Sequence, residues 1–145
     1  MTAAAAIEPI RGDDEPAVLA LNNQHAAELS WLEAGRLSHL LAEAFVAARV
    51  GSLDAFMIAF DQDARYDSPN FLWFRERYPR FAYVDRIAVA AHARGRSLAR
   101  GLYENLFEKA RSRGYPVVTC EVNLDPPNPA SDAFHLALGF QDTGH

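Results

Sequence analysis

The sequence predicts one domain over residues 1–145, of the α/β class, built around a mixed sheet. Three observations predict this class. Segments with helical spacing of apolar residues follow segments with strand-like alternation along the whole chain. The middle of the chain predicts two antiparallel strands around a turn. The second half predicts a strand, a helix and a further strand, the order of a right-handed crossover unit.

Composition limits the classes of function. Half of the 145 residues are hydrophobic, which is enough for a core and argues against disorder. The net charge of -5 disfavours a nucleic-acid binder. Cys120 has no second cysteine to pair with, so nothing indicates an oxidising compartment. The chain start lacks the features of a secretory signal, and no apolar run is long enough to span a bilayer. We therefore expect a cytoplasmic protein with no nucleic-acid or membrane partner.

The first half predicts a strand, two helices and a hairpin. A strand is expected over residues 5–10, and Asp13 or Asp14 can cap the short helix that follows. A second helix is expected over Glu33–Ala44. Residues 45–60 read as two strands around a turn at Gly51–Asp54. The apolar residues of the two helices are Val18, Leu19, Leu21, Leu37, Leu40 and Leu41.

The second half opens with a loop over residues 61–70, rich in Asp, Ser, Pro and Asn, and a short aromatic-rich helix over 71–78. A long strand over 80–90 precedes a helix from about Ser97 to Ser112. The segments that follow are a C-terminal cap at Gly114, a strand over 116–123 and a last helix over 129–139, with Pro129 in its first turn.

The start of the 97–112 helix is unusually basic. Arg94, Arg96 and Arg100 gather there, and residues 88–102 include no acid. A helix N-terminus favours anions, and free backbone N–H groups beside guanidinium groups can bind phosphate. The alternative is that these are solvated arginines in an arginine-rich chain with a single lysine. The segment has neither the GK[ST] of a P-loop nor the three spaced glycines of a dinucleotide fingerprint.

The segment RGRSLA resembles the acyl-CoA pyrophosphate loop of the GNAT superfamily of N-acetyltransferases, whose pattern is [RQ]xxGx[GA]. Arg94 occupies the first position and Ala99 the last, and Ser97 stands in place of the middle glycine. A second block resembles the family's strand ending in EV and the helix after it, with His135 in place of the usual Tyr and a longer loop before Asn128. Its matching positions are Glu121, Val122, Asn128, Ser131, His135, Gly139 and Phe140.

The resemblance implies that the chain binds acetyl-CoA or another acyl-CoA. The pyrophosphate would lie on the backbone N–H groups of residues 96–99, with charge support from Arg94 and Arg96. The strand end at 87–89 would pair with the pantetheine arm, which Asn128 would also touch. The implied cofactor-binding residues are Ile87, Ala88, Val89, Arg94, Gly95, Arg96, Ser97, Leu98, Ala99, Asn128 and Ser131.

Ser97 leaves two conformations open. If its position requires a positive φ, serine is strained there. If it begins the helix in an ordinary conformation, serine is a favoured N-cap whose own N–H stays available. We expect the second case, because Leu98, Leu102 and Leu106 form one helical face immediately afterwards.

The chemistry implied is acetyl transfer to an amine. Attack on a thioester needs a neutral amine, and the departing thiolate gains a proton, so a base and an acid each contribute on the order of 10²- to 10⁴-fold. The resemblance implies Glu121 as base and His135 as acid. Asp85 is a competing base, because strand alternation places it on the face of Ile87 and Val89. The alternatives are a helix residue with no catalytic task for His135 and a salt bridge with an arginine for Asp85.

The resemblance places the amine site between the first two helices, the loop after the third strand and the open end of the sheet. Polar and aromatic loop residues can orient a small ligand there. The predicted contacts are Asn22, Asn23, Glu28, Trp31 and Asn70, and His25, Tyr66 and Trp73 are further candidates. No metal is expected, because the histidines show no metal-ligand spacing with the single cysteine.

The sequence ends at His145, five residues after Phe140, where the family usually continues into a strand pair. The expected fold is therefore a GNAT-like mixed central sheet with helices on both faces and without the final C-terminal strand. Either the chain is shortened, or a neighbouring subunit of a homodimer completes the sheet. The predicted function is an acetyl-CoA-dependent N-acetyltransferase acting on a primary amine of a small molecule or protein. The alternative is a non-catalytic acyl-CoA-binding or regulatory module.

Overall fold

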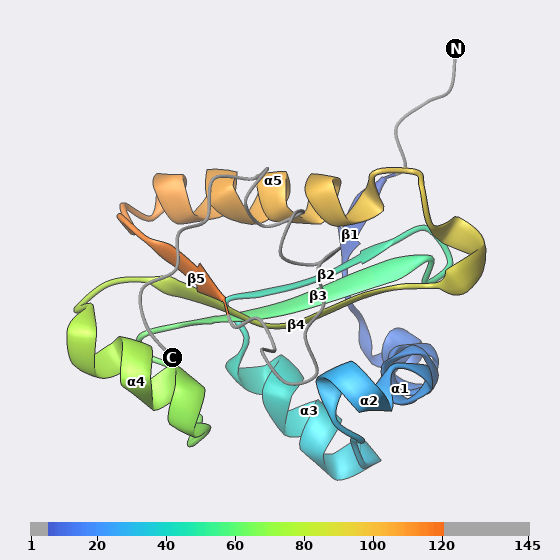
Figure 1. Cartoon of the computed structure of the whole chain (residues 1–145), viewed down its shortest axis with the longest axis horizontal. Helices are drawn as coiled ribbons and strands as arrows, with labels where there is room; N and C mark the ends of the chain where they lie inside the picture. Colours follow the sequence, from blue (N-terminus) through green and yellow to red (C-terminus); the bar gives the residue numbers. More distant parts are fainter. Residues whose placement is uncertain (1–5, 121–145) are drawn as a thin grey trace.

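A central sheet with helices on both of its faces forms the core of the fold (Figure 1). The computed structural model describes residues 6–120, apart from the side chain of Glu28. Helix α5 covers one face of the sheet, and α1 to α4 lie on the other (Figure 1). The elements are β1 (Ile7–Pro9), α1 (Glu15–Gln24), α2 (Ala26–Leu29), α3 (Ala34–Glu43), β2 (Val46–Val50), β3 (Ala55–Asp61), α4 (Pro69–Arg77), β4 (Ala82–Val89), α5 (Leu98–Ser112) and β5 (Val118–Cys120).

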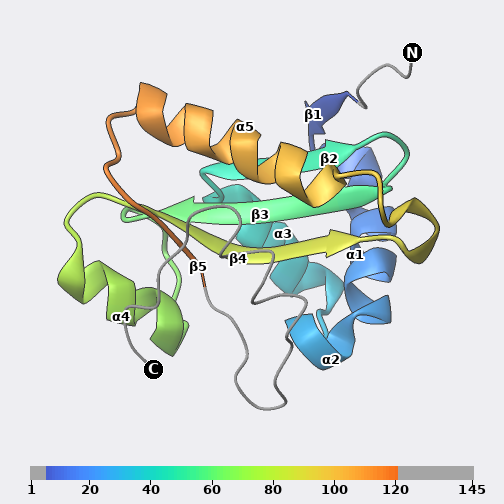
Figure 2. The same cartoon turned by 45° about the horizontal axis from the view of Figure 1, so that its top comes forward.

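The sheet has the order β1-β2-β3-β4-β5. Strands β1 to β4 pair antiparallel, and β5 joins β4 in parallel. Helix α5 makes the connection between β4 and β5 and runs along the sheet (Figure 2). The predicted mixed sheet, the hairpin around Gly51–Asp54 and the parallel crossover are therefore confirmed.

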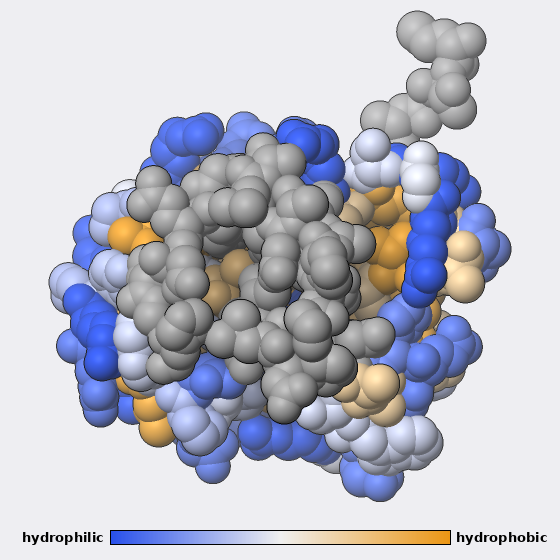
Figure 3. Space-filling view, viewed as in Figure 1, coloured by the Kyte–Doolittle hydropathy of each residue, from blue (hydrophilic) through white to orange (hydrophobic). Residues whose placement is uncertain are grey.

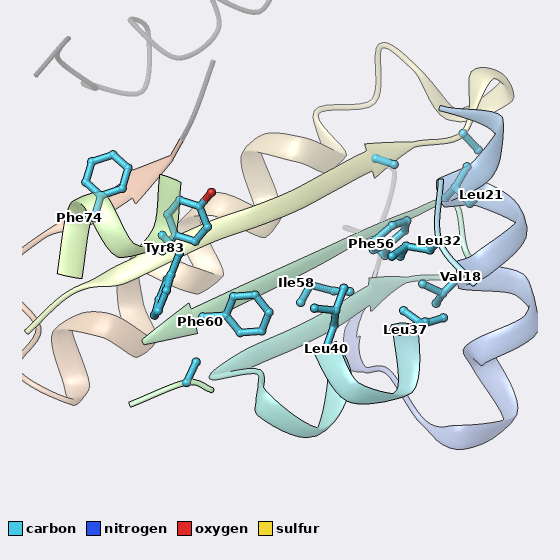
Figure 4. Packing of buried hydrophobic residues seen from close by; sticks show 14 of the residues in the cluster. Val18, Leu21, Leu32, Leu37, Leu40, Phe56, Ile58, Phe60, Phe74 and Tyr83 are labelled. Atoms are coloured by element: carbon cyan, nitrogen blue, oxygen red, sulfur yellow. The ribbon is translucent and has the colours of Figure 1, made fainter. Parts of the chain in front are cut away.

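Each face of the sheet carries its own hydrophobic core. Alternate residues of β3 point to opposite faces, because successive side chains of a strand alternate. Phe56, Ile58 and Phe60 belong to the core that this face shares with α1, α3 and α4 (Figure 4). Met57 packs on the other face beneath α5, whose buried side chains include Leu106. All of these side chains are fully buried, so both layers hold β3 and β4 in place.

The ends of the helices agree with the predictions in position but not always in chemistry. Asp14 precedes α1 as predicted, but its side chain makes no capping bond to the helix. Its carboxylate instead accepts bonds from the backbone N–H of Arg11 and from Arg49. Gly114 does end α5: it has a φ of +73°, and the N–H of Tyr115 reaches back to the carbonyl of Ala110.

One helix was not predicted, and several predicted elements lie outside the described residues. The short helix α2 was not among the predicted elements. The end of the predicted 116–123 strand, the helix over 129–139 and the expected absence of a final strand all concern residues beyond 120 and stay predictions. Within residues 6–120, no helix is both long and apolar enough to cross a membrane.

Candidate active site

A β-bulge shapes the middle of β4. Ile58 of β3 pairs with Arg86, and the next residue, Ala59, pairs with Val84, so Asp85 is the extra residue. The bulge turns Asp85 towards Tyr66, which packs against the core on the α1–α4 side. The prediction that Asp85 shares a face with Ile87 and Val89 was therefore wrong, since Ile87 packs against the core beneath α5. Simple alternation fails where a strand holds one residue more than its partner.

Asp85 is buried and both of its oxygens accept hydrogen bonds. Its Oδ1 accepts from the Tyr66 hydroxyl at 2.6 Å, and its Oδ2 accepts from Nε of Arg86 at 2.7 Å. The side chains of Asp85 and Arg86 are only 5% and 8% exposed. Burial and the neighbouring Asp85 carboxylate raise the pKa of Tyr66 to about 12, so this hydroxyl stays protonated at neutral pH. The salt-bridge alternative for Asp85 is thus what the structure contains.

Arg86 extends this group of polar side chains to the first helix. Its Nη1 donates to Oδ1 of Asn22 at 2.9 Å. Asn22 is 0% exposed, and its amide nitrogen donates to Asn23 and to the carbonyl of Ser30. Asn22, one of the predicted amine contacts, is thus fully buried in this structure and bonded to Arg86 and to the backbone of Ser30.

Among the described residues, one edge of β4 is only partly paired. Among the described residues, β5 accompanies β4 only over Ala82–Val84, whereas β3 pairs with β4 as far as Val89. The backbone of Ile87–Val89, the predicted partner of a pantetheine arm, therefore has no strand beside it on the β5 side within residues 6–120. Such an edge is able to pair with an extended ligand.

The loop between β4 and α5 is held by Asp54, in the turn between β2 and β3. The N–H of Ala90 donates to the backbone carbonyl of Asp54. The Asp54 carboxylate is 3.0 Å from Nε2 of His92 and accepts from Nη2 of Arg96, also at 3.0 Å. These bonds, first to His92 and then to Arg96, hold the pKa of Asp54 below its usual value. Arg96, one of the two predicted phosphate-binding arginines, is thus already paired.

Within residues 6–120, the start of α5 combines backbone N–H groups that lack a helical acceptor with an arginine that has no partner. The first backbone bond of the helix joins the N–H of Gly101 to the carbonyl of Ser97. The N–H groups of Leu98 and Ala99 consequently have no acceptor inside the helix. Arg94 is exposed, and residues 6–120 provide no ion pair or hydrogen bond for its side chain. This end of α5 can therefore hold an anion such as a pyrophosphate.

Ser97 does not adopt the conformation we expected. It stands at the N-cap position of α5, but its φ is 59° and its ψ is 27°, and its side chain makes no capping bond. The ordinary N-cap was therefore the wrong alternative, and the positive φ that favours glycine is the one present. The reason is the sharp reversal from the extended Arg94 through Gly95, with its φ of +81°, into the helix.

This conformation makes Ser97→Gly a stabilising substitution. The left-handed conformation of a residue with a side chain costs about 1–2 kcal/mol, and glycine would remove this cost. The greater freedom of glycine in the unfolded chain offsets part of that gain in stability. We expect the free energy of unfolding to rise by about 0.5–1 kcal/mol in urea titrations. The strain is present before any ligand binds, so its removal does not favour the bound state over the free state. The Kd for acetyl-CoA should therefore stay within about twofold.

Ser112→Gly is the matched control, since Ser112 lies in the right-handed last turn of α5. There glycine should lower stability by about 0.5 kcal/mol. An equal loss of stability in both variants would contradict the strain at Ser97.

The remaining predicted residues are spread over several elements. Trp31 is 63% exposed between α2 and α3, and Asn70 is exposed at the start of α4. Asn23 exchanges two hydrogen bonds with the backbone of Leu32. The predicted residues outside the described part of the chain are Glu121, Asn128, Ser131 and His135.

Sequence reasoning missed Asp54 and Arg86. Asp54 was assigned only to a turn, and Arg86 only to a strand. Their partners Arg96 and Asn22 lie 42 and 64 positions away, and no local pattern links residues so far apart. In the described part of the chain, no three His, Cys, Asp or Glu side chains gather in a group that could hold a metal ion. The expected absence of a metal stays a prediction.

The comparisons with known proteins find acetyltransferases. Residues 70–140 match the model described as the acetyltransferase (GNAT) family. A segment of 82 residues is 27% identical to the L-2,4-diaminobutyric acid acetyltransferase of Wolinella succinogenes, which covers 57% of this chain. The match spans 47% of that enzyme, about half of its length.

Solved structures show the same fold over nearly the whole chain. The aminoglycoside 6'-N-acetyltransferase AAC(6')-IG of Acinetobacter haemolyticus has a TM-score of 0.73 and 24% identity, over 97% of this chain and 93% of that one. The AAC(6')-Iy enzyme, in complex with the bisubstrate analogue CoA-S-monomethyl-acetylneamine, has a TM-score of 0.72 and 17% identity, over 99% and 95% of the two chains. Identities this low establish the fold and leave the substrate open.

Proposed function

We propose that this protein transfers an acetyl group from acetyl-CoA to a primary amine, because residues 70–140 match the acetyltransferase (GNAT) family model and the chain has the fold of solved N-acetyltransferases. The observation that carries the proposal is the basic start of α5 beside the open edge of β4. The N–H groups of Leu98 and Ala99, which have no acceptor inside the helix, and Arg94 suit the pyrophosphate, and the backbone of Ile87–Val89 suits the pantetheine arm. An apolar area also lies beside the loop that enters α5 (Figure 3).

The proposed reaction is direct attack of the neutral amine on the thioester carbon. The amine nitrogen forms a bond to the acetyl carbon, the bond from carbon to sulfur breaks, and the thiolate of CoA leaves. The base takes a proton from the amine, and the acid gives one to the thiolate. We assign these roles to Glu121 and His135. Asp85 is the weaker candidate for the base, because Tyr66 and Arg86 already occupy both of its oxygens.

The acceptor is a primary amine on a small molecule or on a protein. The similar proteins named above include a diaminobutyric acid acetyltransferase and aminoglycoside acetyltransferases, so small polar polyamines are the first class to test. A cytoplasmic location and a homodimer belong to the same proposal. The location is supported by the lone cysteine of the sequence.

The test combines calorimetry with acetyl-CoA and a screen for release of free CoA. The screen would contain 2,4-diaminobutyrate, an aminoglycoside and a peptide with a free N-terminal amine. We expect binding of acetyl-CoA and release of thiol only when an amine is present. Binding without turnover on any amine would favour the non-catalytic module. Absence of binding would contradict the acyl-CoA site itself.

Two arginine variants sharpen the binding measurement. Arg94→Ala should raise the Kd for acetyl-CoA at least about tenfold, because a charge-assisted hydrogen bond contributes about 1.5–3 kcal/mol. Arg100→Ala, which removes a charge that lies 3.9 Å from Glu104, is the matched control and should change the Kd little. Equal effects of the two variants would indicate general charge attraction in place of a defined phosphate contact.

A further inference from the structure

The turn between α2 and α3 has an unusual backbone. Ser30 has a φ of 70° and a ψ of 144°, a region that residues with side chains rarely adopt. A residue stays in such a conformation only where its surroundings impose it. The question is therefore which groups impose it here.

Two asparagines of α1 hold this turn. Nδ2 of Asn22 donates to the carbonyl of Ser30 at 3.0 Å. Asn23 donates to the carbonyl of Leu32 at 3.0 Å and accepts from the N–H of the same residue at 2.9 Å. Three hydrogen bonds thus fix the backbone on both sides of Trp31, between its neighbours Ser30 and Leu32.

The same Asn22 is bound to β4. Its Oδ1 accepts from Arg86, and Arg86 in turn donates to Asp85. All three side chains are buried, so water does not compete for these bonds. A continuous chain of hydrogen bonds therefore joins the bulge of β4 to the turn that carries Trp31.

Trp31 is the residue that this turn presents. It is the one large hydrophobic side chain that is highly exposed among residues 6–120, and its indole N–H donates to Glu33 at 3.1 Å. An exposed indole beside a carboxylate suits a ligand that carries ammonium groups, through the ring face and the negative charge. The unfavourable backbone conformation of Ser30 has a purpose if it fixes the orientation of this indole for a ligand.

We propose that Asn22 and Arg86 are positioning residues that hold the Ser30–Leu32 turn and so orient Trp31 as a contact for a cationic amine acceptor. The acceptor part of this inference rests on the proposed function. The positioning part does not, because it concerns the backbone of the turn alone.

The test uses Asn22→Asp in a Trp73→Phe background, where Trp31 is the only tryptophan. Aspartate still accepts from Arg86 but turns an acceptor towards the carbonyl of Ser30 and towards Oδ1 of Asn23. The bonds to the turn and to Asn23 are therefore lost while the bond to β4 remains. We expect time-resolved fluorescence anisotropy to show faster motion of Trp31. We also expect at least a fivefold rise in KM for the amine, with the Kd for acetyl-CoA unchanged.

Leu106→Ala in the same background is the matched control. Leu106 is a fully buried residue of α5, packed against the opposite face of the sheet. This variant should lose stability without faster motion of Trp31 or a higher KM. Unchanged anisotropy in Asn22→Asp would overturn the positioning role. Faster motion with an unchanged KM would overturn the role of Trp31 in acceptor binding. If no amine is acetylated at all, the proposed function fails, and the anisotropy still decides the positioning role.

Discussion

Asp85→Ala is expected to lower the free energy of unfolding by about 3–5 kcal/mol, the cost of removing one partner of a buried ion pair. Arg86, at 8% side-chain exposure, would keep its charge without the carboxylate, and the Tyr66 hydroxyl would lose its acceptor. Urea unfolding followed by circular dichroism measures the change. The result also matters for enzymology, because a loss of activity in this variant would not by itself identify Asp85 as a catalytic residue.

The double variant Asp85→Leu/Arg86→Met is the control for this prediction. Replacing both charges with apolar groups of similar size is often close to neutral, so it should recover the greater part of the lost stability. A loss below about 1 kcal/mol in Asp85→Ala would show that the pair behaves like an exposed one.

Glu121→Gln is expected to lower kcat/KM by on the order of 10²- to 10⁴-fold, the typical contribution of a general base. Glutamine has nearly the shape of glutamate but cannot take a proton from the amine. The rise of activity with pH that reports the base should also disappear from the profile of kcat/KM. The Kd for acetyl-CoA should not change, because Glu121 is not among the residues expected to contact the cofactor.

Glu108→Gln is the matched control, since Glu108 is an exposed glutamate of α5. It should leave both kcat/KM and the pH profile as they are. If Glu121→Gln keeps the pH profile of the unchanged protein, the base is Asp85 or water. A companion variant, His135→Phe, with unaltered turnover would remove His135 as the acid.

Local patterns predicted the elements well because their causes are local. The α3 helix was expected over Glu33–Ala44 and spans Ala34–Glu43, where spaced leucines and few helix breakers are sufficient. The turn at Gly51–Asp54 joins two strands as expected. The basic start of α5 was also visible in the sequence, since neighbouring residues define it.

The site was less predictable because its contacts join distant segments. Ser97 was assigned an ordinary N-cap, since the sequence does not show how far the chain must turn between β4 and α5. Asp85 was assigned to the wrong face, since a bulge depends on how the partner strand pairs. Asn22 was read as a substrate contact, although its side chain is buried against Arg86.

The sequence by itself determined the order and type of most elements, the basic start of α5 and the family resemblance, because each depends on residues close together in the chain. Only the tertiary structure decided which of the polar residues are free to act. It pairs Arg96 with Asp54 and leaves Arg94 without a partner among the described residues, and it joins Asn22 to β4. The physical reason is that hydrogen bonds and ion pairs form between atoms that folding brings together, whatever their separation in the chain.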